Sequence, residues 1–114
     1  MANSNRDRGN GYERTLAIEM REIGYSDCVT SRSESKSRDD AGVDLCHTGC
    51  LNIQAKYWKS APAYHGVLAG MPNEPGQINC IFHKRAHKGE VVVLSKSDFL
   101  EIVGTNLKEG IWKS

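Results

Sequence analysis

The chain of 114 residues has no long hydrophobic run. None of its apolar stretches approaches the roughly 20 residues that span a bilayer. Residues 1–8 are polar and lack the apolar core of a signal peptide. We therefore expect no membrane partner and a cytoplasmic location.

An excess of one charge is also missing. Fifteen Lys and Arg residues stand against fourteen Asp and Glu residues, which gives a formal net charge of +1. The overall charge therefore does not indicate a nucleic-acid partner, and any DNA-binding surface has to come from the local arrangement of basic residues.

Paired C-x-x-C motifs are absent, although the chain has four cysteines. In a cytoplasmic protein these are predicted to be free thiols, and Cys28 and Cys80 are interpreted as small core residues. The spacings of Cys46-His47-x-x-Cys50 and Cys80-x-x-His83-x-x-x-His87 occur in zinc sites. A small zinc-binding interaction protein therefore stays open as an alternative.

The composition, with 39% hydrophobic and 25% charged residues, predicts a globular protein. The length predicts a single domain over residues 1–114, because we find no internal repeat and no long linker. Residues 1–8 are expected to form a mobile polar arm. The pattern does not determine whether the tail, residues 105–114, is ordered.

Apolar residues at helical spacing predict a helix over residues 10–23, which Gly24 ends. Ser95 and Asp98 resemble a capping box at the start of a last helix, which is expected to end at Gly104. The remaining predictions are strands at 25–32, 78–83 and 90–94, a short helix at 61–69, and polar loops at 31–41 and 71–76.

Residues 42–58 are interpreted as a β-hairpin, because two short apolar-rich runs flank a turn that contains Gly49. Alternation places Gln54 and Lys56 on one face of the second strand. The hairpin would thus gather the Asp44 carboxylate, the Gln54 amide oxygen and the Lys56 ammonium group. The oxygen atoms suit a hard cation such as Mg²⁺, and the ammonium group can stabilise developing negative charge. These are the components of metal-dependent phosphodiester cleavage.

Helices and strands in this order predict an α/β (α+β) fold in which helices pack on a mixed sheet. Several of its segments also carry motifs of a known family. These are Arg8-Gly9-Asn10-Gly11-Tyr12-Glu13-Arg14, Gly24-Tyr25, Ser31-Arg32-Ser33, Gly42-Val43-Asp44-Leu45 and Gln54-Ala55-Lys56. Together they resemble the archaeal-type Holliday junction resolvases and their phage relatives, which belong to the PD-(D/E)xK nuclease superfamily. The resemblance covers residues 8–56, about half of the chain.

The resemblance implies a restriction-endonuclease-like core, a central mixed β-sheet flanked by helices. It also implies that Glu13 is an acidic residue near the metal, Asp44 the central metal ligand and Lys56 the catalytic lysine. Gln54 stands where the family usually has Glu or Asp, so the number of metal ions is left open. The implied ligands of Mg²⁺, which Mn²⁺ can replace, are Glu13, Asp44, Gln54 and the backbone carbonyl of Ala55.

Residues in three regions are predicted to contact DNA. The resemblance assigns Arg14 and Arg32 to phosphates near the scissile bond. The polar loop and a basic turn supply the other candidates, which are Ser33, Ser35, Lys36, Lys84 and Arg85. The basic turn is predicted to contain His83, Lys84, Arg85, His87 and Lys88.

The implied function is that of a homodimeric, Mg²⁺-dependent endonuclease that resolves four-way DNA junctions, without a small-molecule cofactor. A phage-encoded enzyme would act in the cytoplasm of its host. Two alternatives stay open: another nuclease of the superfamily that cleaves or nicks duplex DNA, and a non-catalytic DNA-binding module, which Gln54 keeps open.

Structural roles also stay open for several of these residues. Glu13 would suit the first turn of a helix, where a carboxylate interacts well with the helix dipole. Asp39 and Asp40 would either assist a metal or cap a turn. Tyr57 and Trp58 would either stack on DNA or, for at least one of them, pack in the core or a dimer contact.

Overall fold

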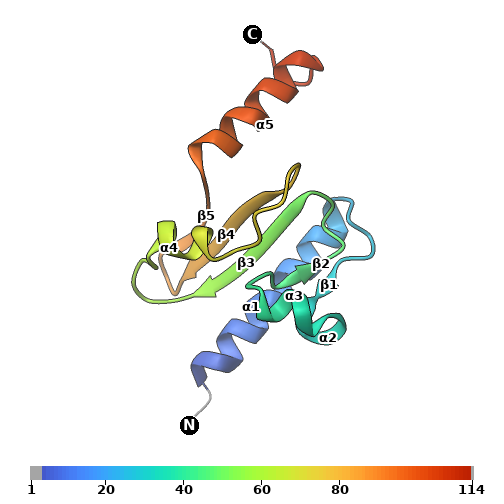
Figure 1. Ribbon diagram of the computed structural model, residues 1–114. Coiled ribbons are helices and arrows are strands. Elements are labelled where there is room, and N and C mark those ends of the chain that lie inside the picture. Colours follow the sequence, from blue (N-terminus) through green and yellow to red (C-terminus); the bar gives the residue numbers. More distant parts are fainter. Residues whose placement is uncertain (1–3, 114) are drawn as a thin grey trace.

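The computed structural model describes residues 4–113, with side chains from Asp7 onward. Figure 1 shows a mixed α+β fold in which helices flank a three-stranded mixed sheet. The elements are α1 (Ser4–Ile23), β1 (Val29–Thr30), α2 (Ser31–Glu34), α3 (Lys36–Asp40), β2 (Leu45–Cys46), β3 (Leu51–Tyr57), α4 (Tyr64–Ala69), β4 (Ile78–Arg85), β5 (Gly89–Leu94) and α5 (Lys96–Lys108).

The main sheet has the strand order β3-β4-β5. Strand β3 pairs in parallel with β4, in a register that sets Lys56 beside His83. Strand β5 pairs with β4 in antiparallel orientation. The mixed sheet predicted from the sequence is therefore confirmed, as are its strands near 78–83 and 90–94.

The hairpin predicted over residues 42–58 does not form. Strand β2 pairs instead with β1 in a separate two-stranded sheet, with Val29 opposite Cys46. One backbone hydrogen bond of 2.7 Å, from the Asp44 N–H to the Ile53 carbonyl, joins this region to β3. The predicted strand at 25–32 shortens to β1 because the chain turns into α2 at Ser31.

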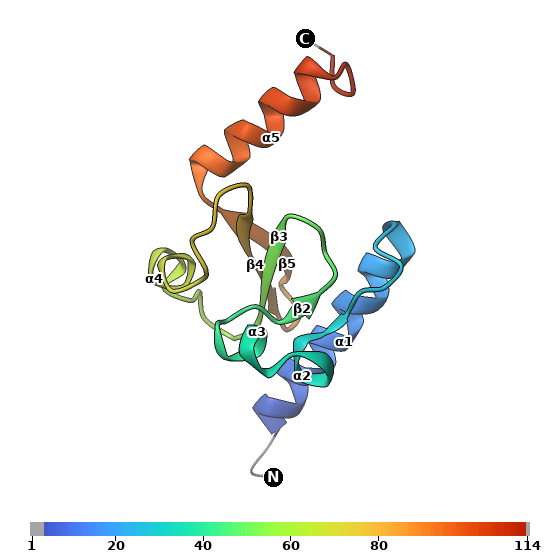
Figure 2. The ribbon, with the colours of Figure 1, turned by 45° about the vertical axis from the view of Figure 1, so that its right-hand side comes forward.

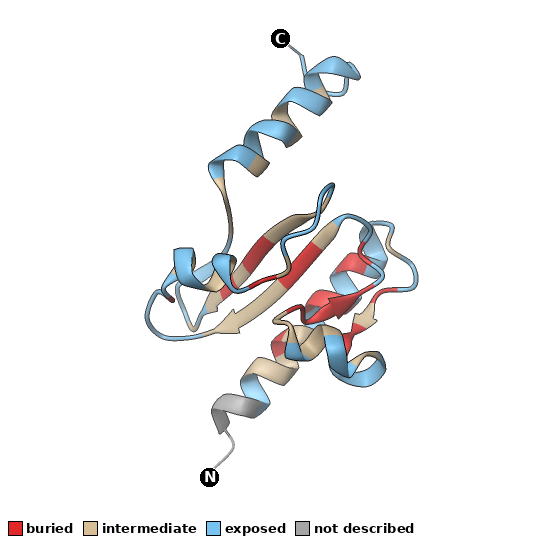
Figure 3. Ribbon diagram, in the orientation of Figure 1, coloured by how far each residue is buried: buried red, intermediate tan, exposed pale blue. Residues whose placement is uncertain are grey.

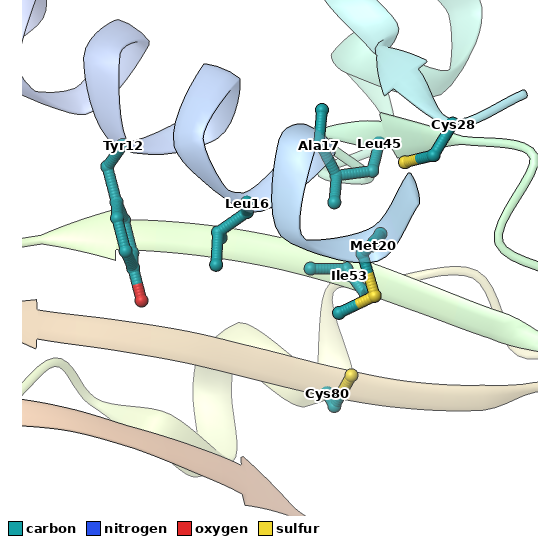
Figure 4. Close-up of a cluster of buried hydrophobic side chains, with 8 residues drawn as sticks. All are labelled: Tyr12, Leu16, Ala17, Met20, Cys28, Leu45, Ile53 and Cys80. Carbon is teal, nitrogen blue, oxygen red and sulfur yellow. The ribbon is translucent and has the colours of Figure 1, made fainter. Parts of the chain in front are cut away.

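Helix α1 covers one face of the sheet. Figure 4 shows the side chains of Tyr12, Leu16, Ala17 and Met20, which belong to one buried cluster with Ile53 of β3. Cys28, Leu45 and Cys80 complete this cluster, so the interpretation of Cys28 and Cys80 as core residues is confirmed. All four cysteines are free thiols, as predicted.

The boundaries of α1 differ from the prediction. Residues 4–8, expected to be a mobile arm, belong to the helix, while residues 1–3 lie outside the described residues. Ile23, one of the apolar residues in the predicted periodic pattern, is 75% exposed. It is the last residue of the helix.

The polar segment 31–41, predicted to be a loop, contains the two short helices α2 and α3. Ser35 ends α2 and caps α3, where its hydroxyl accepts a hydrogen bond from the Arg38 N–H at 3.4 Å. Such local side-chain caps stabilise single turns that carry no apolar period. This explains why periodicity did not indicate the helices.

The start of α5 agrees with the predicted capping box, because the Ser95 hydroxyl accepts a hydrogen bond from the Asp98 N–H at 3.1 Å. The predicted end at Gly104 is wrong. The helix ends at Lys108 and is followed by a Schellman motif, in which Gly110 has a φ of 72° and the Ile111 N–H donates to the Asn106 carbonyl. Helix α4 is shorter than predicted and begins at Tyr64.

Helix α5 stands apart from the sheet in both orientations of the ribbon (Figures 1 and 2). Figure 3 shows it exposed or half-buried along its length, and none of its residues is buried. Among the described helices, none has the length and apolar character that crossing a bilayer requires.

Candidate functional site

Asp44 is held at the outer edge of β3 by its backbone and its side chain. Its N–H donates to the Ile53 carbonyl and its carbonyl accepts from the Ser31 N–H, each at 2.7 Å. Its Oδ2 accepts a third hydrogen bond of 2.7 Å from the Ala55 N–H. Asp44 is only 8% exposed, and these hydrogen bonds give its carboxylate a fixed position beside the strand.

The backbone of Ala55 faces the same edge as Asp44. In a strand, the N–H and the C=O of one residue project to the same side. Since the Ala55 N–H binds Asp44, the Ala55 carbonyl projects toward the Asp44 side and away from β4. This orientation suits the ligand role predicted for that carbonyl.

Gln54 lies against Gly42, in the segment that connects α3 to Asp44. A Cβ atom on Gly42 would lie 3.4 Å from Gln54 Oε1 and 3.5 Å from Nε2, and Gly42 has a φ of 81°. Glycine at this position therefore permits the left-handed backbone conformation and allows the Gln54 amide to lie close to the backbone. The predicted alternation along β3 holds, because Ile53, Ala55 and Tyr57 pack toward the core.

Glu13 reaches the site from α1 and pairs with Arg32 of α2, with 3.3 Å between Oε1 and Nε. Burial, together with the negative charge of Asp44, raises the pKa of Glu13 to about 7 although Arg32 opposes the shift. Burial likewise raises the pKa of Asp44, whereas the Ala55 N–H and the positive charge of Lys56 lower it. The two carboxylates therefore share a partly desolvated region that is short of positive charge.

The ligand types present fit a hard cation, since they comprise two carboxylates, an amide and a backbone carbonyl. Within residues 7–113, however, no three His, Cys, Asp or Glu side chains are close enough together to hold a metal. Binding of Mg²⁺ here would therefore depend on Gln54 and Ala55 as well as on Glu13 and Asp44.

Lys56 points toward Trp58, with its Nζ 4.5 Å from the centre of the indole ring. This is within the range of a cation–π interaction. The charge of Lys56 still lowers the pKa of Asp44. Lys56 is thus near enough to Asp44 for its charge to stabilise the carboxylate, although its ammonium group contacts the Trp58 ring.

The residues predicted to contact DNA have different surroundings. Arg14 and Arg85 are exposed, and Arg32 is paired with Glu13. The hydroxyl of Ser33 donates to the Thr30 carbonyl, and Ser35 caps α3. The exposed Lys36 pairs with Asp40 at 2.8 Å, and Lys84 lies 5.6 Å from the ring of Tyr57.

The basic turn is smaller than the sequence suggested, because His83 does not belong to it. His83 is 2% exposed and lies between the Tyr64 hydroxyl, at 2.8 Å from Nδ1, and the Trp58 carbonyl, at 3.0 Å from Nε2. Neither partner is near His83 in the sequence, so no local signal could have found this arrangement.

Two residues of α3 also act on the site: Asp39, which the sequence offered as one of two carboxylates that would assist a metal, and Arg38, which was missed. The charge of Asp39 raises the pKa of both Glu13 and Asp44, whereas Asp40 faces Lys36. Arg38 donates to the Leu45 carbonyl at 3.0 Å and so fixes the segment that carries Asp44. The sequence shows that Arg38 and Asp39 lie a few residues before Asp44. It does not show that α3 turns both side chains toward the site.

Searches with protein-family models, the curated proteins and the solved structures found no match to this chain.

Proposed function

We propose that this protein is a metal-dependent, structure-selective DNA endonuclease that resolves four-way junctions by paired phosphodiester hydrolysis. The observation that carries this proposal is the convergence of Glu13, Asp44 and Lys56 at the edge of β3. Asp44 is fixed there by three hydrogen bonds, and its charge raises the pKa of Glu13. The restriction-endonuclease-like fold is part of the same proposal.

The metal would be held by Glu13, Asp44, the Gln54 amide oxygen and the Ala55 carbonyl. When bound, Mg²⁺ would lower the pKa of a coordinated water and offset charge on the phosphate. The chain itself supplies three further effects. The Ala55 N–H orients the Asp44 carboxylate, Arg32 offsets the charge of Glu13, and Lys56 can stabilise the negative charge that develops on the phosphate.

A second candidate function, DNA binding without cleavage, is favoured by one specific observation. The described side chains do not form a group of three His, Cys, Asp or Glu residues, and Gln54 replaces one of the carboxylates expected of the superfamily. A site with two carboxylates holds a divalent cation less strongly than one with three. In this candidate, the fixed Asp44 would have a structural role.

The experiment that tests the proposal compares a labelled four-way junction with a linear duplex of the same sequence, with Mg²⁺ and with EDTA. We expect symmetric cleavage of the junction that requires Mg²⁺. Equal cleavage of the duplex would indicate a less selective nuclease, and junction binding without cleavage would support the second candidate.

We further propose that the protein acts as a homodimer in which two α5 helices pair in antiparallel orientation. Leu100, Val103 and Leu107 lie on one face of α5 at helical spacing, and both leucines are exposed. Because β5 is followed by α5 after the single residue Ser95, the helix projects outward from the end of its own sheet (Figure 2).

A second copy of this chain would present the same apolar face, so the two faces would be complementary about a two-fold axis. Such a two-fold contact is self-complementary, and it would place one candidate site on each side of a junction.

A further inference from the structure

A cavity of about 780 Å³ lies beside the candidate site, at the C-terminal end of β3. Its walls are Arg8 and Gly9 of α1, residues 55–60, and Ala86 from the turn between β4 and β5. Ala55, whose N–H binds Asp44, belongs to this lining. Gly9 also lies one helical turn before Glu13, on the same side of α1. The cavity therefore adjoins the site through Ala55 and Lys56.

The chemistry of the lining is cationic and aromatic. Arg8, Lys56 and Lys59 supply positive charge, and none of the described residues that line the cavity is acidic. Trp58 is 44% exposed, and its ring lies 4.5 Å from Lys56 Nζ. An accessible indole surrounded by cations is the combination that binds a base and its phosphates in single-stranded nucleic acids.

Trp58 is presented on a rigid backbone. Its N–H donates to the Lys84 carbonyl at 3.2 Å, and its carbonyl accepts from Nε2 of the buried His83 at 3.0 Å. Since Nε2 must then carry the proton, Nδ1 accepts from the Tyr64 hydroxyl at 2.8 Å. This chain of hydrogen bonds links α4 to the end of β3 and fixes the backbone that carries the indole.

Resting on the proposed function, we infer that this cavity binds one unpaired nucleotide next to the scissile phosphate, with its base stacked on Trp58. Arg8 and Lys59 would contact the flanking phosphates. A volume of about 780 Å³ is within the range of sites that enclose a small ligand. Bases in a continuous duplex are stacked on each other and cannot reach an indole in this way. The preferred substrate is therefore branched DNA with unpaired nucleotides at the branch point.

Fluorescence titration tests this inference without using cleavage. A Trp112→Phe variant leaves Trp58 as the single tryptophan. In EDTA, this variant is titrated with a fully paired four-way junction and with the same junction carrying two unpaired thymidines at its centre. We expect quenching and at least about fivefold tighter binding with the unpaired bases, the lower end of what one stacked base contributes. Equal affinity and equal fluorescence for the two junctions would overturn the inference.

Two variants at position 58 separate stacking from folding. Trp58→Ala should bind both junctions equally, whereas Trp58→Phe, which keeps an aromatic face, should retain most of the preference. A preference that persists in Trp58→Ala contradicts the inference. Quenching by thymidine monophosphate at the same concentration as the junctions would show that the cavity takes free nucleotides instead.

The binding and cleavage experiments can contradict the nucleotide site and the nuclease proposal separately. A protein that prefers unpaired bases but never cleaves any junction contradicts the nuclease proposal and retains the nucleotide site. A protein that cleaves paired junctions in Mg²⁺ and binds both junctions equally retains the nuclease proposal and loses this site.

Discussion

The Asp44 carboxylate accepts a 2.7 Å hydrogen bond from the backbone N–H of Ala55 on the neighbouring strand β3. This bond fixes one carboxylate oxygen and leaves the other to bind a further group. It also occupies an N–H on the edge of the sheet that would otherwise lack a partner. The same contact therefore serves the fold and orients the residue that we place at the centre of the site.

Replacing Asp44 with Asn should separate these two roles. The amide oxygen of Asn can still accept the Ala55 N–H, so the fold and junction binding should be retained. The negative charge is lost, and cleavage should fall by at least about a hundredfold, more than the loss of a residue that only orients a metal ligand. Rates of junction cleavage at saturating protein measure the effect.

Asp40→Asn is the matched control for this substitution, since Asp40 is an exposed carboxylate on the same segment that pairs with Lys36. It should cleave at the wild-type rate. If Asp44→Asn cleaves as fast as this control, Asp44 does not belong to a catalytic site.

Gly42→Ala should disturb Gln54 as well as the backbone. The two glycines Gly42 and Gly76 have the same φ of 81°, but a Cβ atom at Gly42 would meet the Gln54 amide at 3.4 Å, whereas one at Gly76 would meet nothing within 4 Å. Both substitutions should destabilise the fold by about 1–2 kcal/mol, the cost of a side chain in the left-handed region.

The difference between the two alanine variants isolates the contact with Gln54. We expect the Mg²⁺ concentration for half-maximal cleavage to rise in Gly42→Ala and to stay unchanged in Gly76→Ala. Equal Mg²⁺ dependence of the two variants would contradict a ligand role for Gln54.

The sequence predicted the parts of this fold whose signals are local. Strand β4 has alternating apolar residues, β5 has the β-branched run Val91-Val92-Val93, and the start of α5 has its capping residue Ser95. The hairpin was wrong because the partner of β2 is β1, and two residues carry too little pattern to identify a partner elsewhere in the chain. His83 looked like part of a basic turn because its partner Tyr64 is 19 residues away.

Metal-free protein should lose stability as the pH rises through the range where Glu13 ionises. The pKa of Glu13 is about 7 in the folded state and ordinarily 4.5, so between these values the folded state binds more protons than the unfolded state. Stability therefore falls with rising pH across this window. Glu13→Gln, which cannot ionise, should gain stability relative to wild type at pH 8 and not at pH 4.

Urea denaturation in EDTA at the two pH values measures this difference, with Glu22→Gln as a control for removing one negative charge from an exposed position of α1. Added Mg²⁺ should raise the stability of the wild type at pH 8 and not that of Glu13→Gln. A gain of equal size at pH 4 and pH 8 would contradict the buried ionisation of Glu13.

Leu107→Asp should weaken the proposed dimer by at least about tenfold, because burial of a leucine contributes about 1.5–3 kcal/mol. Ile23→Asp is the control, since Ile23 is 75% exposed and lies on α1. Sedimentation equilibrium measures both dissociation constants. A wild-type protein that is monomeric at all accessible concentrations would contradict the α5 pairing.

Tyr64→Phe should destabilise the protein by about 1–3 kcal/mol, because it leaves Nδ1 of the buried His83 without its hydrogen-bond donor. The ring is retained, so the loss reports the hydroxyl alone. Tyr25→Phe is the matched control, since the Tyr25 hydroxyl forms no side-chain hydrogen bond within residues 7–113, and it should change stability by less than about 0.5 kcal/mol. Urea denaturation of the two variants measures the difference. Equal stabilities would mean that His83 finds another donor, such as water, and that Tyr64 does not fix the segment carrying Trp58.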